Sequence, residues 1–484
     1  MLRFGARPIG RRDERIRAAY DARASEGILT MTLMQSALLG SASLPNAAPL
    51  GASLPGCFLS VASAGDHLAI RALLMDGGRE GWAGEFQAQL EEPTYEPTDR
   101  LVIRNGAAIA AHVHLRNREL NFGSRRIPAT WLADLITAPK FRRRGLGSSL
   151  VAAAERQALA DGAELALVRT TQPRLFQRRG WVAWGRPSYS RAGAREILAH
   201  LVRRQGEPSA SLEGVFQGAR PAPLTTRLWR HVEQAALERM YHHHTQGSYG
   251  PPVRSSDYWR WLVSRHGFDA IYVAVAGRDR WSLDAKGIVG YALVKQDRVV
   301  ELFTAPERPD AGESLMARVC GEFIEQDRCD LRLDAAPNHP WHAELIAAGG
   351  EYSNPDSEAG SVSLARILDA PRFLAKLSGE FSARASRANL PVGAELAIRC
   401  GSLAARLVVV ADGEVQVLLD APSERAVECD AATLSQWLLG HLRVDAPPTA
   451  GRIVRWPDRE SLAAAKVLFP KLPYWRPVWD DLPA

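Results

Sequence analysis

One short run of residues has the types and spacing of an anion site. It extends from Leu135 to Leu150 and reads Leu-Ile-Thr-Ala-Pro-Lys-Phe-Arg-Arg-Arg-Gly-Leu-Gly-Ser-Ser-Leu. Pro139 ends an apolar, strand-like stretch, and Gly147 to Asp161 has the periodicity of an amphipathic helix. At such a junction the N–H groups of the first helical turn have no partner within the helix and point at one place. With the helix dipole they bind anions, and a pyrophosphate fits.

Glycine and arginine have separate roles in this loop. Gly145 and Gly147 let a phosphate approach the backbone closely, and the arginines at 142–144 add charge-assisted contacts. The run lacks the Gly-Lys-Ser/Thr of a P-loop and the Gly-x-Gly-x-x-Gly of a dinucleotide fold. The alternative without a ligand is a glycine-rich helix start whose arginines are simply solvated.

The run resembles the Arg/Gln-x-x-Gly-x-Gly/Ala motif of the GNAT superfamily of N-acetyltransferases, matched by Arg142, Gly145 and Gly147. The segment 176–181, Phe-Gln-Arg-Arg-Gly-Trp, looks like the aromatic-x-x-x-Gly-aromatic segment that follows the next strand in GNAT proteins. Over residues 57–484 the layout resembles the enhanced-intracellular-survival (Eis) family. That resemblance implies an α/β protein with mixed sheets, in which two tandem GNAT-like domains precede an α+β domain like a sterol carrier protein.

The resemblance also implies a site and a reaction. The backbone of Leu135, Ile136 and Thr137 would hold the pantetheine and thioester of acetyl-CoA, the co-substrate. The pyrophosphate would contact Arg143, Arg144, Gly145, Leu146, Gly147 and Ser148. A further cofactor contact would come from Thr171 and Gln172. The implied reaction is N-acetyl transfer to a primary amine of a cationic small molecule or a Lys side chain. A non-catalytic CoA- or lipid-binding protein on the same scaffold is the alternative.

The catalytic groups depart from the family pattern. The family is expected to use a Tyr as acid and the chain's own terminal carboxylate as base, but Phe176 stands at the Tyr position. Ala484 ends the chain where an aromatic residue is usual, and its carboxylate is the candidate base. Tyr189 is another candidate acid, although a core role is commoner for such a residue.

The aromatic residues of the C-terminal tail are expected to anchor it on the other domains, and Asp480 and Asp481 to add negative potential near the acceptor. The anchors are Tyr474, Trp475 and Trp479.

A second copy of the pattern follows. Thr137-Ala138-Pro139 recurs as Thr304-Ala305-Pro306, and in both copies a glycine comes six residues after the proline. A hairpin over 288–304, a helix over 312–326 and a strand over 330–334 surround the second copy, which indicates a duplicated domain. Pro309 and Asp310 stand where the first copy has arginines. Because proline lacks an N–H and aspartate repels phosphate, the second copy should not bind CoA.

Turn signals and composition shifts predict the organisation of the chain. Asn105-Gly106 and Asp412-Gly413 each separate two apolar runs and predict hairpins. These patterns predict a mobile arm at 1–56, a mixed α/β domain at 57–190, a helix and linker at 191–222, a repeat of that domain at 223–361 and a separate α+β domain at 362–484. The resemblance implies that the three domains are an acetyl-CoA-binding GNAT domain, a degenerate GNAT-like domain and a sterol-carrier-like domain.

Composition narrows the class of protein. The 484 residues are 46% hydrophobic and 24% charged, which is typical of globular domains. The net charge of +6 is spread over the whole chain, so nucleic-acid binding is not expected. Five scattered cysteines without a Cys-x-x-Cys predict a reducing, cytoplasmic location. No apolar run is long enough for a membrane span.

No metal is expected, because the consecutive side chains of His242, His243 and His244 fan out around a helix. The sequence leaves self-association into a homo-oligomer open.

Overall fold

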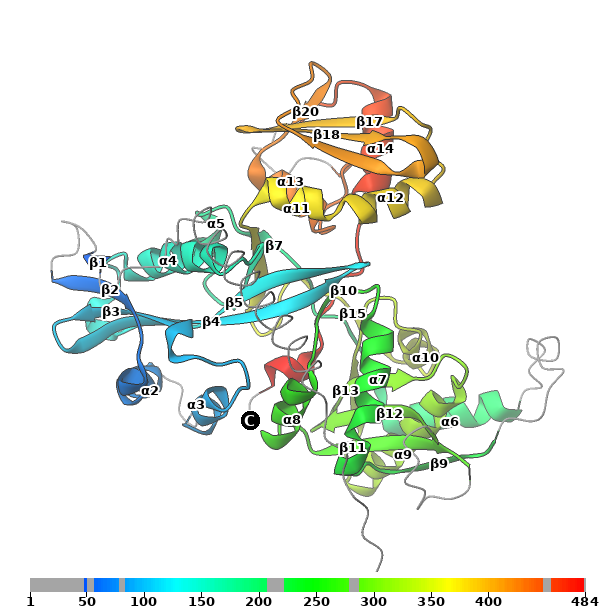
Figure 1. The fold of residues 1–484 in the computed structure, drawn as a ribbon. Coiled ribbons are helices and arrows are strands. Elements are labelled where there is room, and N and C mark those ends of the chain that lie inside the picture. The colour runs from blue at the N-terminus through cyan, green and yellow to red at the C-terminus, as the bar shows by residue number, and fades with distance from the viewer. Residues whose placement is uncertain are drawn as a thin grey trace, which may run out of the picture. The chain divides into compact units, whose positions relative to one another are not determined.

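The computed structural model describes residues 48–49, 56–77, 83–206, 222–277, 287–446 and 454–482. Their strands form three sheets with helices packed against them (Figure 1). The expected α/β class with mixed sheets is confirmed. Almost all of the expected N-terminal arm lies outside the described residues, as does residue range 207–221 of the expected linker.

The first sheet contains the Leu135 to Leu150 run. Its order is β1-β2-β3-β4-β5-β6-β16-β7, and β10 pairs with β4. The nine strands are β1 (Ala48–Pro49), β2 (Cys57–Val61), β3 (Arg100–Asn105), β4 (Ala108–Phe122), β5 (Arg125–Thr137), β6 (Leu165–Thr170), β7 (Val182–Ala183), β10 (Tyr249–Pro252) and β16 (Val362–Ile367). The predicted Asn105-Gly106 hairpin is confirmed as β3 and β4, and β4 runs further than the sequence indicated because its second half pairs with β5.

Helices lie on both faces of this sheet, with α4 and α5 on one face and α2 and α3 on the other (Figure 1). They are α2 (His67–Asp76), α3 (Ala83–Leu90), α4 (Leu146–Ala160) and α5 (Pro173–Gln177). The buried face of α4 carries the apolar residues predicted from its periodicity, among them Leu150, Val151 and Ala154. This face packs against β3, β4 and β5, so burial of α4 fixes the loop that precedes it.

The second sheet repeats the arrangement, as the recurrence in sequence predicted. Its order is β15-β8-β14-β13-β12-β11-β9. The strands are β8 (Tyr189–Gly193), β9 (Leu224–Leu228), β11 (Ala270–Ala276), β12 (Ile288–Lys295), β13 (Arg298–Thr304), β14 (Asp330–Asp334) and β15 (Glu351–Ser353). In both sheets an antiparallel meander ends in a strand that pairs in parallel with the next one through a crossover helix, α4 in the first and α9 in the second.

Helices also pack around the second sheet. They are α6 (Ala194–Gly206), α7 (Gln234–Thr245), α8 (Ser256–Ser264), α9 (Asp310–Glu325) and α10 (Trp341–Ala347). In the part of the chain that is described, no helix is long and apolar enough to cross a membrane.

The two sheets exchange strands. β8 follows the first sheet in sequence but pairs with β14 and β15 of the second. β16 follows the second sheet but pairs with β6 and β7 of the first. The expected boundaries near residues 190 and 361 therefore fall at strands that join the two sheets together.

The third sheet has four strands in the order β19-β18-β17-β20 and lies in the C-terminal region. The strands are β17 (Glu395–Cys400), β18 (Leu403–Val409), β19 (Val415–Leu419) and β20 (Ala426–Glu428), and the helices are α11 (Ala370–Lys376), α12 (Ser378–Arg387), α13 (Ala431–Leu438) and α14 (Arg459–Leu468). The predicted hairpin at Asp412-Gly413 joins β18 to β19. The likeness to a sterol carrier protein stays a prediction.

Candidate active site

The strands β5 and β6 separate at the end of the first sheet. Their parallel pairing covers Ala129 to Trp131 on β5 and Leu165 to Leu167 on β6. β5 continues to Thr137 and β6 to Thr170. We call the space between these strand ends, residues 132–137 and 168–170, the split. Beyond Trp131 the edge of β5 that faces β6 has no ladder partner among the described strands, so its peptide groups can bind a ligand.

A bulge in β5 lies beside this opening. The register between β4 and β5 shifts between His112 and His114, and Asp134 opposite them has a left-handed backbone with φ of 53°. Such a bulge bends the strand locally. His112 Nδ1 lies 3.1 Å from the carbonyl oxygen of Asp134, which fixes the kinked peptide.

The loop after β5 presents backbone N–H groups to solvent. Arg143 and Gly145 have left-handed backbones, with φ of 61° and 84°, and α4 begins directly after them. Alternation of left- and right-handed residues forms a concavity lined with N–H groups that binds anions. A hydrogen bond of 3.2 Å from Arg142 Nε to the carbonyl of Thr137 ties the loop to the end of β5. The side chains of Arg142, Arg143 and Arg144 are exposed.

The residues expected to contact the cofactor surround the open end of the split. A Cβ at Gly147 would lie 4.0 Å from Thr137 Oγ1 and 3.7 Å from Leu175 on α5, so the end of β5 and the starts of α4 and α5 meet here. Leu135 and Ile136 precede Thr137 on β5, and Thr171 and Gln172 join β6 to α5. Their roles toward acetyl-CoA stay predictions.

Phe176, at the expected position of the acid, and Tyr189 both pack against other side chains. The ring of Phe176 is 1% exposed and lies edge-to-face against Trp181 at 5.1 Å between centroids. Tyr189 is half-buried on β8, and the guanidinium of Arg332 covers its ring at 3.8 Å. Ala484 lies outside the described residues.

Glu155 on α4 is a buried anchor that the sequence did not reveal. It accepts from Arg179 Nη2 at 2.6 Å and from Trp181 Nε1 at 2.7 Å, and pairs with Arg366 at 2.8 Å. Burial raises the pKa of Glu155, but the bonds from Arg179 and Trp181 outweigh burial and leave it below the ordinary value. The only sequence signal is an acidic residue within the apolar face of a helix.

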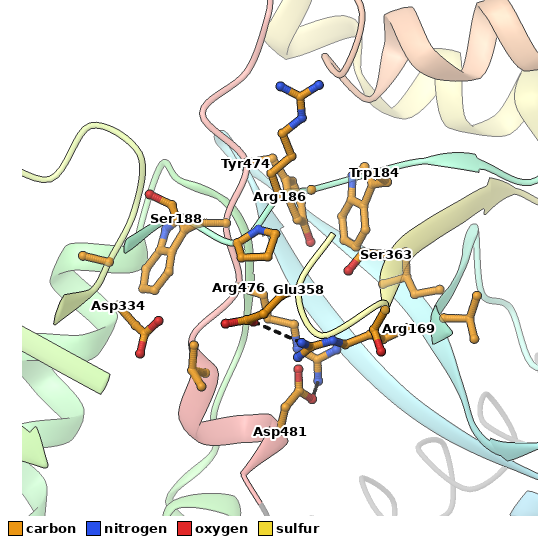
Figure 2. Close-up of a pocket in the computed structure, with 18 of the residues that line it drawn as sticks. Arg169, Trp184, Arg186, Ser188, Asp334, Glu358, Ser363, Tyr474, Arg476 and Asp481 are labelled. Carbon is orange, nitrogen blue, oxygen red and sulfur yellow. Dashed lines mark hydrogen bonds and ion pairs between the residues drawn. The ribbon is translucent and has the colours of Figure 1, made fainter. Parts of the chain in front are cut away.

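A cavity of about 90 Å³ lies at the base of the split (Figure 2). Trp131 of β5 and residues 167–169 of β6 form one wall, and residues 474–476 of the tail form another. Arg476 lies over the ring of Trp131, with its Cζ 4.3 Å from the ring centroid. The sequence predicted that the tail docks on other domains, and the burial of Tyr474, Trp475 and Trp479 confirms this.

The split of the second sheet keeps a cavity of about 320 Å³, lined by residues 301–303 of β13 and by residues 334–336 at the end of β14. Parallel pairing of β13 and β14 covers only Arg298–Val299, and the strands then separate as in the first sheet. Two histidines bond the carbonyls of β13: His244 Nε2 meets Thr304 O, and His339 Nε2 meets Leu302 O at 3.2 Å. At the start of α9, a Cβ at Gly312 would lie 2.8 Å from Trp341 Nε1, so this indole covers the helix terminus.

Comparison with known proteins agrees with this geometry. Residues 77–183 match the family model described as an acetyltransferase (GNAT) domain. No curated protein matches the sequence. Among solved structures, a GCN5-related N-acetyltransferase from Anabaena variabilis is 13% identical, covers 87% of this chain and 99% of its own, and has a TM-score of 0.65. One from Kribbella flavida is 17% identical, with coverage of 87% and 97% and a TM-score of 0.61.

Eis1 from Mycobacterium abscessus is also similar in fold. It is 17% identical, with coverage of 87% and 99% and a TM-score of 0.57. At these identities the likeness establishes the shared fold over most of the chain. The chain therefore contains a GNAT acetyltransferase domain, and acyl transfer is the reaction class of that domain.

Proposed function

We propose that the protein transfers an acetyl group from acetyl-CoA to a primary amine. The observation that carries the proposal is the left-handed turn at Arg143 and Gly145, which leads from the separated end of β5 into α4. The pyrophosphate would bind the N–H groups of residues 143–148, and the pantetheine would lie along the free edge of β5 at residues 135–137. The thioester would then reach the split, with Thr171 and Gln172 on its far side.

The reaction needs one base and one acid. The amine nitrogen must lose a proton before it attacks the thioester carbonyl, forming an N–C bond while the C–S bond breaks. The leaving thiolate takes up a proton. We propose the carboxylate of Ala484 as the base, as the Eis resemblance implies. Phe176 has no proton to donate, so water or another side chain supplies it.

A second candidate function follows from Phe176. A buried phenyl ring at the expected position of the acid favours a protein that binds CoA without catalysis. The two functions differ in a thiol-release assay with acetyl-CoA and mixed primary amines. Release of CoA thiol only in the presence of an amine supports the transferase, and tight CoA binding without any release supports the binding protein.

Calorimetric titration with CoA tests the site itself. We expect one CoA per chain, because Pro309 and Asp310 replace the arginines of the first copy and Trp341 covers the start of α9. Gly147→Asp should abolish binding: the added carboxylate repels the pyrophosphate, while the position has room for a Cβ. Gly321→Asp on α9 is the matched control, since a Cβ there meets no atom within 4 Å. Unchanged affinity in Gly147→Asp, or two equivalent sites per chain, would contradict the assignment.

A further inference from the structure

The carboxylates that line the cavity at the base of the split are all neutralised by arginines. The carboxylate of Asp334 forms ion pairs with Arg332 at 2.6 Å and with Arg298 at 2.7 Å. The carboxylate of Glu358 forms ion pairs with Arg332 at 2.6 Å and with Arg169 at 3.1 Å. Four arginines thus hold three carboxylates, the third being Asp481.

Arg476 completes this set from the tail. Its Nη2 lies 2.8 Å from Asp481, while its guanidinium stacks on Trp131. Figure 2 shows Arg169, Arg476, Glu358 and Asp481 gathered at one side of the cavity. The residues that line the cavity carry four positive and three negative formal charges, so positive charge exceeds negative charge there by one; they are Arg169, Arg186, Arg332 and Arg476 with Asp334, Glu358 and Asp481.

Hydrogen-bond donors at the cavity remain unused. Arg476 Nε and Trp184 Nε1 are buried and have no acceptor within the described part of the chain. Trp184 is only 3% exposed, so solvent cannot readily replace a partner. The side chain of Arg169 is 47% exposed and uses one of its nitrogens on Glu358. Arg476 Nε and Trp184 Nε1 have almost no accessible surface, so a ligand in the cavity reaches the exposed guanidinium of Arg169 rather than these two atoms.

We propose that this cavity selects an acceptor that carries a carboxylate besides its primary amine, with Arg476 and Arg169 as the residues that bind the carboxylate. The inference rests on the proposed function, because it places the acceptor where β5 and β6 separate. A guanidinium binds a carboxylate through charge-assisted hydrogen bonds, and Arg476 is already oriented by its stacking on Trp131.

A polycationic acceptor fits these charges poorly. The arginines that line the cavity outnumber its carboxylates by one, so an added carboxylate is favoured there over a second ammonium. The family resemblance led to the expectation of a cationic acceptor, whereas the charges of this cavity favour a zwitterion. Its ammonium end would face the thioester, and its carboxylate end would face the tail.

Three five-carbon amines test the proposal: 5-aminopentanoate, pentylamine and 1,5-diaminopentane. We expect kcat/KM for 5-aminopentanoate to exceed that for 1,5-diaminopentane by about tenfold, with pentylamine between them. Binding of each compound to the CoA-loaded protein is measured separately by calorimetry. Equal values, or preference for the diamine in both measurements, would overturn the proposal.

Two variants of the Arg476–Asp481 ion pair should change the preference for 5-aminopentanoate in opposite directions. Arg476→Gln frees the Asp481 carboxylate and should lower the preference for 5-aminopentanoate about tenfold. Asp481→Asn frees the guanidinium of Arg476 and should raise that preference. A purely structural ion pair would shift activity toward all three amines equally in both variants, and thermal unfolding checks that both remain folded. Should Arg476→Gln fail to fold, Asp481→Asn alone decides, because no rise in preference contradicts the proposal.

Failure of the two proposals can be told apart. A protein that releases no thiol with any amine refutes the transferase, while the calorimetric preference still tests the cavity. A protein that acetylates amines without favouring a carboxylate keeps the proposed function and refutes the selection by Arg476.

Discussion

Glu155 links the helix of the proposed CoA site to two other segments. It joins α4 to the 178–181 turn through Arg179 and Trp181, and to β16 through Arg366. Glu155 itself is buried, whereas the side chains of Arg179 and Arg366 are 27% and 34% exposed. Its charge therefore contributes to stability only while it stays ionised, and solvent screening limits the contribution.

Glu155→Gln should lower the free energy of unfolding by about 2 kcal/mol at pH 7, because a buried charge network loses its anion. The pKa of Glu155 lies below its ordinary value of 4.5, so the stabilisation is present above that pH and is lost as pH falls through the folded pKa. Below about pH 4.5, the free energy of unfolding of the wild type, measured with denaturant, should therefore fall more steeply with pH than that of Glu155→Gln. If the free energies of unfolding of the two proteins fall in parallel with pH, another group controls the pH dependence of stability in this range.

Residue-level prediction from the sequence worked where spacing alone determines chemistry. The glycines at 145 and 147 and the proline at 139 mark a strand-to-helix junction whatever packs around it, and the loop has that form. Glu155 and Arg476 could not be predicted, because their partners are distant in sequence and charged residues are usually solvent-exposed.

At the scale of elements, the exchange of β8 and β16 makes the two GNAT-like sheets interdependent. β16 is a central strand between β6 and β7, so its backbone groups bond on both edges. Leu364 and Ala365 are at most 1% exposed, which places this late segment of the chain in the core of the first sheet. Stability of the proposed CoA domain therefore depends on residues nearly two hundred positions later.

Ala365→Asp should destabilise the first sheet by about 4 kcal/mol, because it buries an unpaired carboxylate between β6 and β7. Gln416→Asp is the matched control, since Gln416 is exposed on the edge strand β19. Hydrogen exchange should show the loss of protection in β6 of the Ala365→Asp variant. Normal protection there would mean that β16 contributes little to the sheet.

The hairpins could be predicted from the sequence, whereas the exchange of β8 and β16 between the sheets could not. Asn105-Gly106 and Asp412-Gly413 specify local turns, and each joins two neighbouring strands as predicted. The pairing of β16 with β6 depends on which apolar strand reaches a free edge, and any alternating segment satisfies the local pattern. The expected boundaries at 190 and 361 came from such local patterns, which contain no information on strands that pair across domains.

At the scale of the whole molecule, the C-terminal tail connects all three sheets. Tyr474 packs in the core shared by the first and third sheets, and Trp475 and Trp479 pack in that of the second. Asp480 lies 2.7 Å from Arg254, and both side chains are at most 1% exposed. Burial raises the pKa of Asp480, but the charge of Arg254 outweighs burial and leaves it below the ordinary value. This carboxylate therefore stays ionised as an internal anchor.

The anchor changes the expected electrostatics of the tail. Asp480 and Asp481 were expected to add negative potential near the acceptor, but Asp480 shares Arg254 with Glu301 in a buried cluster, and Asp481 pairs with Arg476. The tail is instead held in position up to Leu482, whose carbonyl accepts from Arg265.

Deletion of residues 482–484 tests that carboxylate as the base. Because Asp480 and its ion pair with Arg254 remain, the anchor should survive the deletion and the fold should be intact. If the terminal carboxylate accepts the proton of the ammonium, turnover should fall by about tenfold, equivalent to about 1.4 kcal/mol in the barrier, while CoA affinity is unchanged. The matched control adds one alanine after Ala484, which moves the carboxylate by one residue and should also slow turnover. Full activity in both proteins would show that the tail only straps the sheets together, and the proton would then have to leave by way of water or another side chain.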